Sequence, residues 1–279
     1  MNVLHTIREV RRWRSLSEGS VGLIPTMGYL HAGHLSLLAQ ARAENSRTAV
    51  SIFVNPAQFG PRDDLASYPR DLDRDLDGLR AAGCDVVFAP LADEMYRAGY
   101  GTWVDPGAVA DRLEGARRPG HFRGVATVVL KLLNIVTPTR AYFGEKDAQQ
   151  LAVIRKMTAD LDLGVEIVGC PIVRESDGLA MSSRNTYLGR EDRAAAAVLF
   201  RALRAAREAW VAGEARGCAL QEVMQRTIAG EPRAALDYAV VADPETFAEV
   251  EAAGEGALLL TAARVGPTRL IDNMRLVRP

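Results

Sequence analysis

The sequence predicts an α/β fold, in which a Rossmann-like parallel sheet with helices on both faces is followed by a smaller α+β domain. Short apolar runs with the composition of buried strands alternate with helix-like stretches up to about Val173. Polar motifs follow several of these runs, at the strand ends where parallel sheets bind ligands. Beyond Val173 a long stretch rich in Ala and Arg precedes further strand-like runs. We therefore expect two domains, residues 1–173 and 174–279.

Turn residues bound the elements of the first domain. The apolar run Val21–Ile24 ends at Pro25 and Gly28, and a β-branched run over 48–54 ends at Asn55-Pro56. This alternation is typical of parallel strands joined by crossover helices. Strands are expected at 21–24, 48–54, 85–88, 140–143 and 165–168, and helices at 35–44, 72–82, 125–135 and 149–160.

The second domain is expected to combine helices with strands. The stretch over 191–212 is rich in Ala and Arg, and its arginines are expected to form the solvated face of one long amphipathic helix. A further helix is expected near 220–229, and strands at 236–241, 257–263 and 269–272.

Composition argues against several classes of protein. The chain has 34 Lys and Arg against 35 Asp and Glu, a formal net charge of −1, which gives no electrostatic reason to expect nucleic acid or an anionic membrane surface. Three scattered cysteines without a Cys-x-x-Cys pair argue against a disulfide framework. No run is typical of a signal peptide or a membrane span. We expect a soluble, cytoplasmic protein.

The segment Ile24–His34, Ile-Pro-Thr-Met-Gly-Tyr-Leu-His-Ala-Gly-His, has the pattern of a strand, a glycine turn and a helix start. Unpaired N–H groups and the positive end of the helix dipole favour an anion at such a start. His31 and His34, three residues apart, are expected on one face of the first helical turn. Gly33 permits close approach of a ligand to the backbone. The segment is therefore typical of a site for nucleotide phosphates.

Other interpretations of the two histidines are a helix cap, core packing and a metal site. Metal ligation would need a third and usually a fourth ligand. Neither His5 nor His121 has Cys or carboxylate neighbours at a recognisable ligand spacing. The sequence therefore favours phosphate binding over a metal site.

Two further motifs carry cationic groups. Gly144–Gln150 follows an expected strand and joins a lysine to carboxylates and amides. Lys146 can neutralise a phosphate oxygen, and Asp147 or Asp75 can hold a Mg²⁺ ion. Met181–Arg184 combines two hydroxyls with a guanidinium, groups that suit phosphate oxygens and a departing pyrophosphate. Taken singly, the first motif can also be a surface turn and the second a helix cap.

Gln58 and Gln150 offer neutral amides, which can hold a hydroxyl and a carboxylate. A neutral amide leaves a carboxylate nucleophilic, whereas a paired arginine would stabilise its charge. The chain contains no Gly-x-x-x-x-Gly-Lys-Ser/Thr, Gly-x-Gly-x-x-Gly or Gly-x-Ser-x-Gly motif. A covalent enzyme nucleophile is therefore not indicated, and we expect catalysis by positioning and by stabilisation of phosphate charge.

Seven segments together resemble the pantothenate synthetase family, the pantoate–β-alanine ligases of the cytidylyltransferase-like nucleotidyl transferase superfamily. They span almost the whole chain in the family's order, which is far more specific than any single motif. The segments are PTMGYLHAGH (25–34), VSIFVNPAQFG (50–60), YPRDLDRDL (68–76), LEGARRPGHFRGV (113–125), FGEKDAQQL (143–151), VGCPIVRESDGLAMSSRN (168–185) and RLIDN (269–273).

The resemblance implies a two-step reaction. ATP and pantoate would give an enzyme-bound pantoyl adenylate and pyrophosphate. The amine of β-alanine would then attack the activated carbonyl and release pantothenate and AMP. The resemblance also implies Mg²⁺ with ATP, a homodimer, and a C-terminal domain that acts as a lid.

The resemblance assigns roles to individual residues. His34 matches the family's catalytic residue, and we expect His31, Lys146 and Arg184 to act beside it on phosphate charge. The ATP-binding residues implied are Met27, Gly28, Tyr29, Leu30, His31, Ala32, Gly33, His34, Gly144, Glu145, Lys146, Asp147, Val173, Met181, Ser182, Ser183 and Arg184.

The remaining assignments concern the acid, the amine and the metal. Gln58 and Gln150 would hold pantoate, Gln58 would also bind β-alanine, and Asp75 would be the metal ligand. The chain departs from the family's pattern at Ala148, where an aromatic residue is usual, and at Cys170, where an aliphatic residue is common. Neither position is an assigned substrate contact.

Two other functions fit parts of the pattern. A nucleotidyltransferase of the same fold that adenylates a phosphate-bearing acceptor would face that acceptor with arginines, whereas glutamines favour a carboxylate. A non-catalytic nucleotide sensor would not need Lys146, Arg184 and both histidines, because sensing does not require pyrophosphate to leave.

Overall fold

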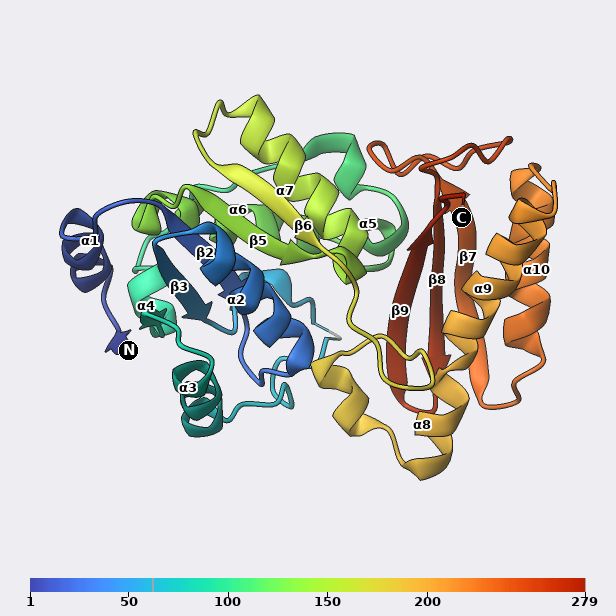
Figure 1. The fold of residues 1–279 in the computed structure, drawn as a ribbon, viewed down its shortest axis with the longest axis horizontal. Helices are drawn as coiled ribbons and strands as arrows, with labels where there is room; N and C mark the ends of the chain where they lie inside the picture. The colour runs from blue at the N-terminus through green and yellow to red at the C-terminus, as the bar shows by residue number, and fades with distance from the viewer. Residues whose placement is uncertain (62, 279) are drawn as a thin grey trace. The chain divides into compact units, whose positions relative to one another are not determined.

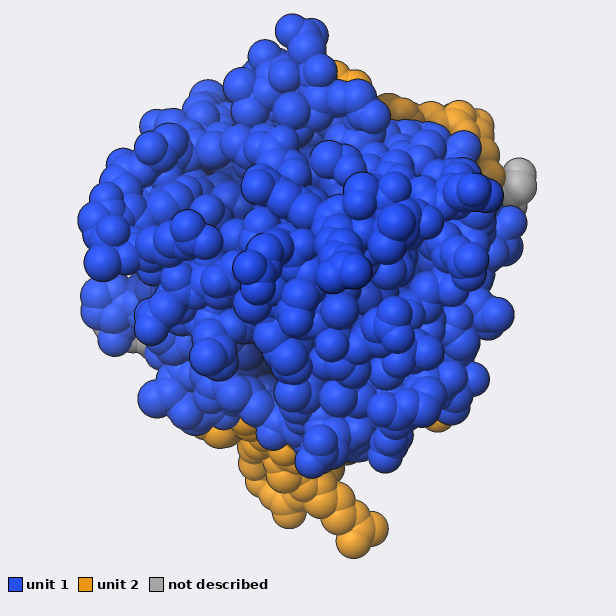
Figure 2. Space-filling model, turned by 90° about the vertical axis from the view of Figure 1, so that its left-hand side faces the viewer, with its two compact units in different colours: residues 1–145, 153–171 blue, residues 146–152, 172–279 orange. Residues whose placement is uncertain are grey.

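The chain forms two compact units in the computed structural model, which describes residues 1–61 and 63–278. Unit 1 comprises residues 1–145 and 153–171, and unit 2 comprises residues 146–152 and 172–279. Figure 2 gives each unit its own colour. Each unit contains one sheet, so an α/β fold with a second, smaller sheet is present as predicted. The predicted domain limits, 1–173 and 174–279, stay a prediction.

A six-stranded parallel sheet forms the centre of unit 1, in the order β1-β4-β3-β2-β5-β6 (Figure 1). The five expected strands are present, and β1 is an addition that pairs with β4 at the sheet edge. Its three residues are too few to give a recognisable alternation of apolar and polar residues. The strands are β1 (Asn2–Leu4), β2 (Val21–Thr26), β3 (Arg47–Ile52), β4 (Val86–Phe88), β5 (Arg140–Gly144) and β6 (Glu166–Cys170).

Both faces of this sheet are covered. Ile24 of β2 and Val50 of β3 are buried in one cluster with Leu38 of α2. Successive strand residues point to opposite faces, and the neighbours Leu23 and Ala49 are also buried. The helices that begin before residue 161 are α1 (Ile7–Ser15), α2 (Ala32–Glu44), α3 (Leu72–Ala81), α4 (Ala92–Met95), α5 (Leu113–Arg117), α6 (His121–Val136) and α7 (Ala148–Asp160). No helix within residues 1–61 and 63–278 is long and apolar enough to cross a bilayer.

The strand order creates a topological switch between β2 and β5. From β2 the chain proceeds outward through β3 and β4 and then returns to β5, on the other side of β2. Ligands of such sheets bind outside the carboxyl ends of the strands beside the switch. These ends lead into Met27 after β2 and Glu145 after β5. The predicted phosphate motif and the start of the Gly144–Gln150 motif therefore lie at the same edge.

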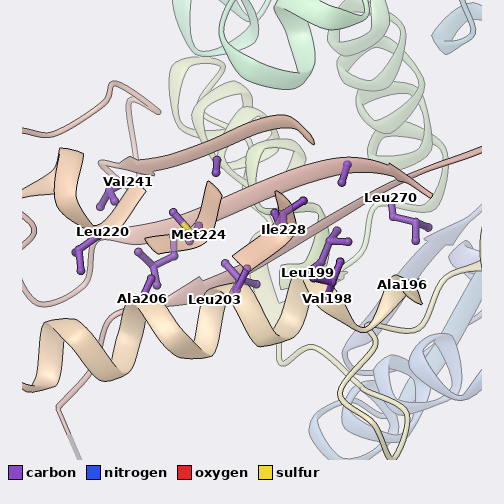
Figure 3. Close-up of a cluster of buried hydrophobic side chains, with 14 of the residues drawn as sticks. Ala196, Val198, Leu199, Leu203, Ala206, Leu220, Met224, Ile228, Val241 and Leu270 are labelled. Atoms are coloured by element: carbon purple, nitrogen blue, oxygen red, sulfur yellow. The ribbon is translucent and has the colours of Figure 1, made fainter. Parts of the chain in front are cut away.

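A three-stranded antiparallel sheet in the order β7-β8-β9 packs against two long helices in unit 2. Figure 3 shows apolar side chains of this core, which α8, α9, α10 and the sheet contribute. The elements are α8 (Arg190–Ala196), α9 (Val198–Val211), α10 (Gly217–Ala229), β7 (Ala234–Ala242), β8 (Leu258–Val265) and β9 (Thr268–Arg275).

The single helix expected over 191–212 is two helices, so this prediction was wrong. α8 ends at Ala196 and α9 begins at Val198, with Ala197 as the cap of both. A straight amphipathic helix buries one stripe, whereas all five residues over 195–199 are buried. The break at Ala197 accommodates this burial. Beyond it, Arg201 and Arg204 are exposed, as expected of a solvated face.

All three cysteines are free thiols. Cys84 and Cys170 are buried and Cys218 is exposed. Burial raises the pKa of both buried thiols to about 11, so neither is poised to act as a nucleophile at neutral pH.

Candidate active site

The segment between β2 and α2 is a tight turn with left-handed backbone. Gly28 has a φ of +83° and Tyr29 a φ of +52°. A Cβ atom at Gly28 would lie 3.1 Å from the Ile52 side chain and 3.2 Å from the Asp75 carboxylate. Glycine at 28 therefore suits both the conformation and the available space. Tyr29 has no such freedom, so its conformation must be held by its surroundings.

The carboxylate of Asp75 holds this turn. Asp75 lies in the first turn of α3 and is 2 % exposed. Its Oδ2 accepts the Tyr29 N–H at 2.6 Å, and its Oδ1 accepts the Leu30 N–H at 2.7 Å. The neighbouring Arg74 donates to the Leu30 carbonyl at 2.8 Å and stacks over the Tyr29 ring at 4.1 Å. Hydrogen bonds to a charged group are the strong kind, so α3 braces the turn through both the N–H and the carbonyl of Leu30.

This use of Asp75 changes its expected role. Both carboxylate oxygens accept backbone N–H groups, and the described residues contain no group of three or more His, Cys, Asp or Glu side chains that could hold a metal ion. Mg²⁺ commonly binds through one or two carboxylates together with substrate phosphates. Both Asp75 oxygens thus brace the turn, and its assignment as a Mg²⁺ ligand stays a prediction.

His31 and His34 open α2 with their Nδ1 atoms turned to the backbone. Nδ1 of His31, the N-cap, accepts the Gly33 N–H at 3.2 Å, and Nδ1 of His34 accepts the His31 N–H at 3.3 Å. The ring centroids are 4.1 Å apart. A nitrogen that accepts an N–H bond is unprotonated, so each neutral ring carries its proton on Nε2. The two histidines cap the helix, and the donor nitrogen of each ring is Nε2.

The main chain orients the side-chain amide of Asn55, which is 1 % exposed. Its Oδ1 accepts the Ala57 N–H at 3.2 Å and the Tyr96 hydroxyl at 2.8 Å. Its Nδ2 donates to the Gly124 carbonyl at 3.1 Å. A main-chain N–H only donates and a carbonyl only accepts, so this amide has one possible orientation.

Asn55 in turn orients Gln58, which ends a short 3-10 helix, η1 (Pro56–Gln58), and is 8 % exposed. Nδ2 of Asn55 donates to Gln58 Oε1 at 3.0 Å, which leaves Nε2 as the donor end of the Gln58 amide. That nitrogen lies 3.2 Å from Met27 Sδ, beside the turn. The structure therefore brings Gln58 and Met27 together, and it presents a neutral donor that suits an oxygen of an organic acid.

His121 is a buried, neutral bridge to the main chain of Gln58. Its Nδ1 donates to the Gln58 carbonyl at 2.8 Å, and its Nε2 accepts from the Arg118 guanidinium at 3.1 Å. Burial and, secondly, the positive charge of Arg118 lower the pKa of His121 to about 4, against the opposing effect of the Gln58 carbonyl. Its proton thus lies on Nδ1, the opposite tautomer from His31 and His34.

The Val173 and Met181–Arg184 segments of unit 2 form a hairpin and a capped turn. The Met181 N–H donates to the Val173 carbonyl at 3.0 Å, and Arg174 forms a bridge with Ala180. The hydroxyl of Ser182 accepts the Arg184 N–H at 3.3 Å and caps η4 (Ser183–Tyr187). Ser182 is therefore a helix cap, which was the alternative interpretation of the Met181–Arg184 motif. Val173 and Met181 lie directly opposite each other in the hairpin.

Lys146 lies in η3 (Glu145–Asp147), directly after β5. Its side chain is 19 % exposed, and its ammonium lies 3.6 Å from an Asp147 carboxylate oxygen. Gln150 is half-buried in the first turn of α7. Unit 1 contains the predicted residues Met27–His34, Gln58, Gly144 and Glu145, and unit 2 contains Lys146, Asp147, Gln150, Val173 and Met181–Arg184.

Comparison with known proteins identifies the family. The model of a family described as pantoate-beta-alanine ligase matches residues 2–275. The chain belongs to the pantoate-beta-alanine ligase family. It is 60 % identical over 273 residues to the pantothenate synthetase of Roseiflexus sp. strain RS-1, covering 98 % of each chain.

Solved structures of family members agree with the fold. Pantothenate synthetase from Thermus thermophilus is 47 % identical, with a TM-score of 0.96 and 100 % of both chains covered. A pantoate-beta-alanine ligase from Francisella tularensis, complexed with beta-gamma ATP and beta-alanine, is 33 % identical. Its TM-score is 0.83, with 100 % of this chain and 99 % of that chain covered.

Several supporting residues of this ligase family member were not indicated by the sequence pattern. Asn55 was visible only as part of a strand-ending Asn-Pro pair, and Asp75 was assigned to a metal and not to the turn. The RLIDN segment, 269–273, carried the resemblance without an assigned role. The supporting residues that the sequence did not assign are Asn55, Arg74, Tyr96, His121, Arg174, Asp272 and Asn273.

Asp75→Asn is expected to raise the KM for ATP about 10-fold or more, because the amide offers one acceptor oxygen and turns a donor toward a backbone N–H. Steady-state kinetics across ATP concentrations measure this effect. Asp73→Asn, an exposed change in the same helical turn, is the control and should behave as wild type. Recovery of the Asp75→Asn enzyme by excess Mg²⁺ would contradict the bracing role and support a metal ligand.

Titration of His121 is expected to reduce stability on acidification. The unfolded chain takes up its proton near pH 6.5 and the folded chain near pH 4, so the unfolded state binds more protons between these values. The free energy of unfolding should therefore fall, by about 3 kcal/mol from this group, as the pH is lowered from 6.5 to 4. Urea unfolding of wild type and His121→Gln measures the difference, which should shrink with falling pH. A difference that is constant over this range would contradict the buried neutral ring.

Proposed function

We propose that this chain joins pantoate to β-alanine by way of pantoyl adenylate, with cleavage of ATP to AMP and pyrophosphate. The observation that carries the proposal is the start of α2 at the topological switch, where two histidines with donor Nε2 atoms follow a braced turn. Membership of the pantoate-beta-alanine ligase family supports the reaction. The ligands of the Francisella tularensis relative support ATP and β-alanine as substrates.

In the first step a carboxylate oxygen of pantoate attacks the α-phosphorus of ATP. A new P–O bond forms, the bond to the bridging oxygen breaks, and negative charge develops on the departing pyrophosphate. We assign His31, His34, Lys146 and Arg184 to this charge, assisted by the N-terminus of α2. The step transfers no proton, so hydrogen bonds from two neutral imidazoles are sufficient. The other ATP contacts are assigned within 27–34, 144–147, 173 and 181–184.

In the second step the amine of β-alanine attacks the acyl carbon of pantoyl adenylate. The C–N bond forms, the C–O bond to AMP breaks, and the nitrogen releases its proton to solvent water. We assign Gln58 and Gln150 to pantoate and Gln58 also to β-alanine. During the first step the Gln58 donor, held in place through Asn55, leaves the pantoate carboxylate nucleophilic. A neutral amide here favours a carboxylate over the phosphate-bearing acceptor of a related nucleotidyltransferase.

We further propose that ATP enters as its Mg²⁺ complex, that the chain acts as a homodimer and that it is cytoplasmic. The preference of Mg²⁺ for substrate phosphates, with several waters retained, supports a metal that arrives with the nucleotide. Residues 174–279 are proposed as the smaller domain that the resemblance implies.

The purified chain is expected to convert ATP, pantoate and β-alanine to equal amounts of pantothenate and AMP in the presence of Mg²⁺. Without β-alanine, labelled pyrophosphate should exchange into ATP only when pantoate is present, because adenylation is then the reversible step. Exchange that requires phosphopantetheine instead would support the related nucleotidyltransferase. Binding of ATP with no exchange would support a sensor, and either result would refute the proposal.

His34→Ala and Lys146→Ala are each expected to lower the rate of exchange about 10²-fold, the scale of losing one transition-state donor. His34→Gln should recover part of this loss, since its amide can donate from a position near Nε2. Gln40→Ala, farther along α2, is the control and should exchange normally. Equal activity of His34→Ala and wild type would remove His34 from the site.

A further inference from the structure

The RLIDN segment contains two buried polar residues to which the reaction above gives no role. Asp272 and Asn273 are consecutive residues of β9 and are 3 % and 5 % exposed. Their side chains leave opposite faces of the strand. Each binds a different segment of unit 2, and both of these segments carry proposed ATP contacts.

Asn273 holds the backbone at Lys146. Its Nδ2 donates to the Lys146 carbonyl at 2.9 Å, across 127 positions of sequence. This carbonyl belongs to η3, the single turn that leads from β5 directly into α7. The hydrogen bond therefore holds the backbone of Lys146, to which its side chain is attached.

Asp272 holds the hairpin that begins after Val173. Its two oxygens accept from Arg174 at 2.6 and 2.9 Å in a bidentate pair. The same guanidinium donates to the carbonyls of Gly178 at 2.9 Å and Asn273 at 3.1 Å, and it stacks on the Phe200 ring at 4.4 Å. Arg174 thus closes the hairpin and joins it to β9 through these hydrogen bonds.

We propose that Asp272 and Asn273 are positioning residues for adenylation. Asn273 fixes the position of the Lys146 backbone. Asp272 acts through Arg174 and fixes the position of the hairpin that contains Val173 and Met181. Because the two residues are adjacent on one strand, the ammonium and the hairpin keep a fixed mutual geometry. Misplacement of such groups by about one ångström reduces rates substantially. The inference rests on the proposed function, since it concerns the proposed ATP contacts.

Asn273→Ala in the full chain is expected to lower the turnover rate of pantoate-dependent pyrophosphate exchange about 10- to 100-fold, with the KM for β-alanine unchanged. The decisive measurement is the exchange rate of the double variant that combines Asn273→Ala with Lys146→Ala. If Asn273 acts through Lys146, the double variant should be no slower than Lys146→Ala alone. Arg275→Ala is the control, because it removes another bond from a β9 side chain to a carbonyl, that of Gly256.

Asp272→Asn provides an independent arm of the test. It keeps the shape of the side chain but turns an amide donor toward the Arg174 guanidinium, so we expect a KM for ATP raised about 10-fold and a normal KM for β-alanine. Should Asn273→Ala fail to fold, Asn273→Ser, whose hydroxyl is too short to reach the Lys146 carbonyl, replaces it.

The outcomes separate this inference from the proposed function. Wild-type protein without exchange would overturn both. If the wild-type protein catalyses exchange, two results would overturn the positioning role alone. One is a wild-type exchange rate in Asn273→Ala. The other is a double variant whose rate loss is the product of the losses in the two single variants.

Discussion

The two hydrogen bonds that the Asp75 carboxylate accepts from Tyr29 and Leu30 are the constraint on which the site depends. They hold Tyr29 in a left-handed conformation that its side chain disfavours. With the turn held, His31 becomes the N-cap of α2, and the backbone N–H groups of the cap fix both Nδ1 atoms. The orientation of the two donor nitrogens thus follows from a carboxylate that binds the backbone of the two residues before His31.

The adenylation step proposed for the site needs hydrogen-bond donors and positive charges, and it does not need a general acid. Adenylation moves negative charge onto pyrophosphate without moving a proton, so neutral imidazoles, an ammonium and a guanidinium meet its requirements. On the acid side, the Gln58 amide is fixed by Asn55, and Asn55 is fixed by main-chain groups that have only one hydrogen-bonding role each. In the proposed mechanism, the histidines of the adenylation step and the Gln58 amide are thus both oriented by the backbone.

The sequence predicts the elements that local patterns determine. The β2–turn–α2 unit was predictable because an apolar run, Gly28 and a periodic helix follow one another within residues 21–44. The role of Asp75 was not, because an acidic residue that binds N–H groups 45 and 46 positions away looks in sequence like a metal ligand. The contact of Asn273 with Lys146 and the break at Ala197 likewise result from tertiary packing. Strand β1 has only three residues, too few to show the alternation of apolar and polar residues that predicts a strand.

The most direct measurement is the tautomeric state of the four histidines, read from long-range proton–nitrogen NMR correlations of protein labelled with ¹⁵N-histidine at a pH where the rings are neutral. We expect a proton on Nε2 in His31 and His34. We expect the opposite tautomer in His5 and His121, whose Nδ1 atoms lie 2.9 and 2.8 Å from the carbonyls of Ala89 and Gln58. A protonated Nδ1 in His31 or His34 would contradict this expectation, because the backbone N–H bonds that orient these rings could not then exist.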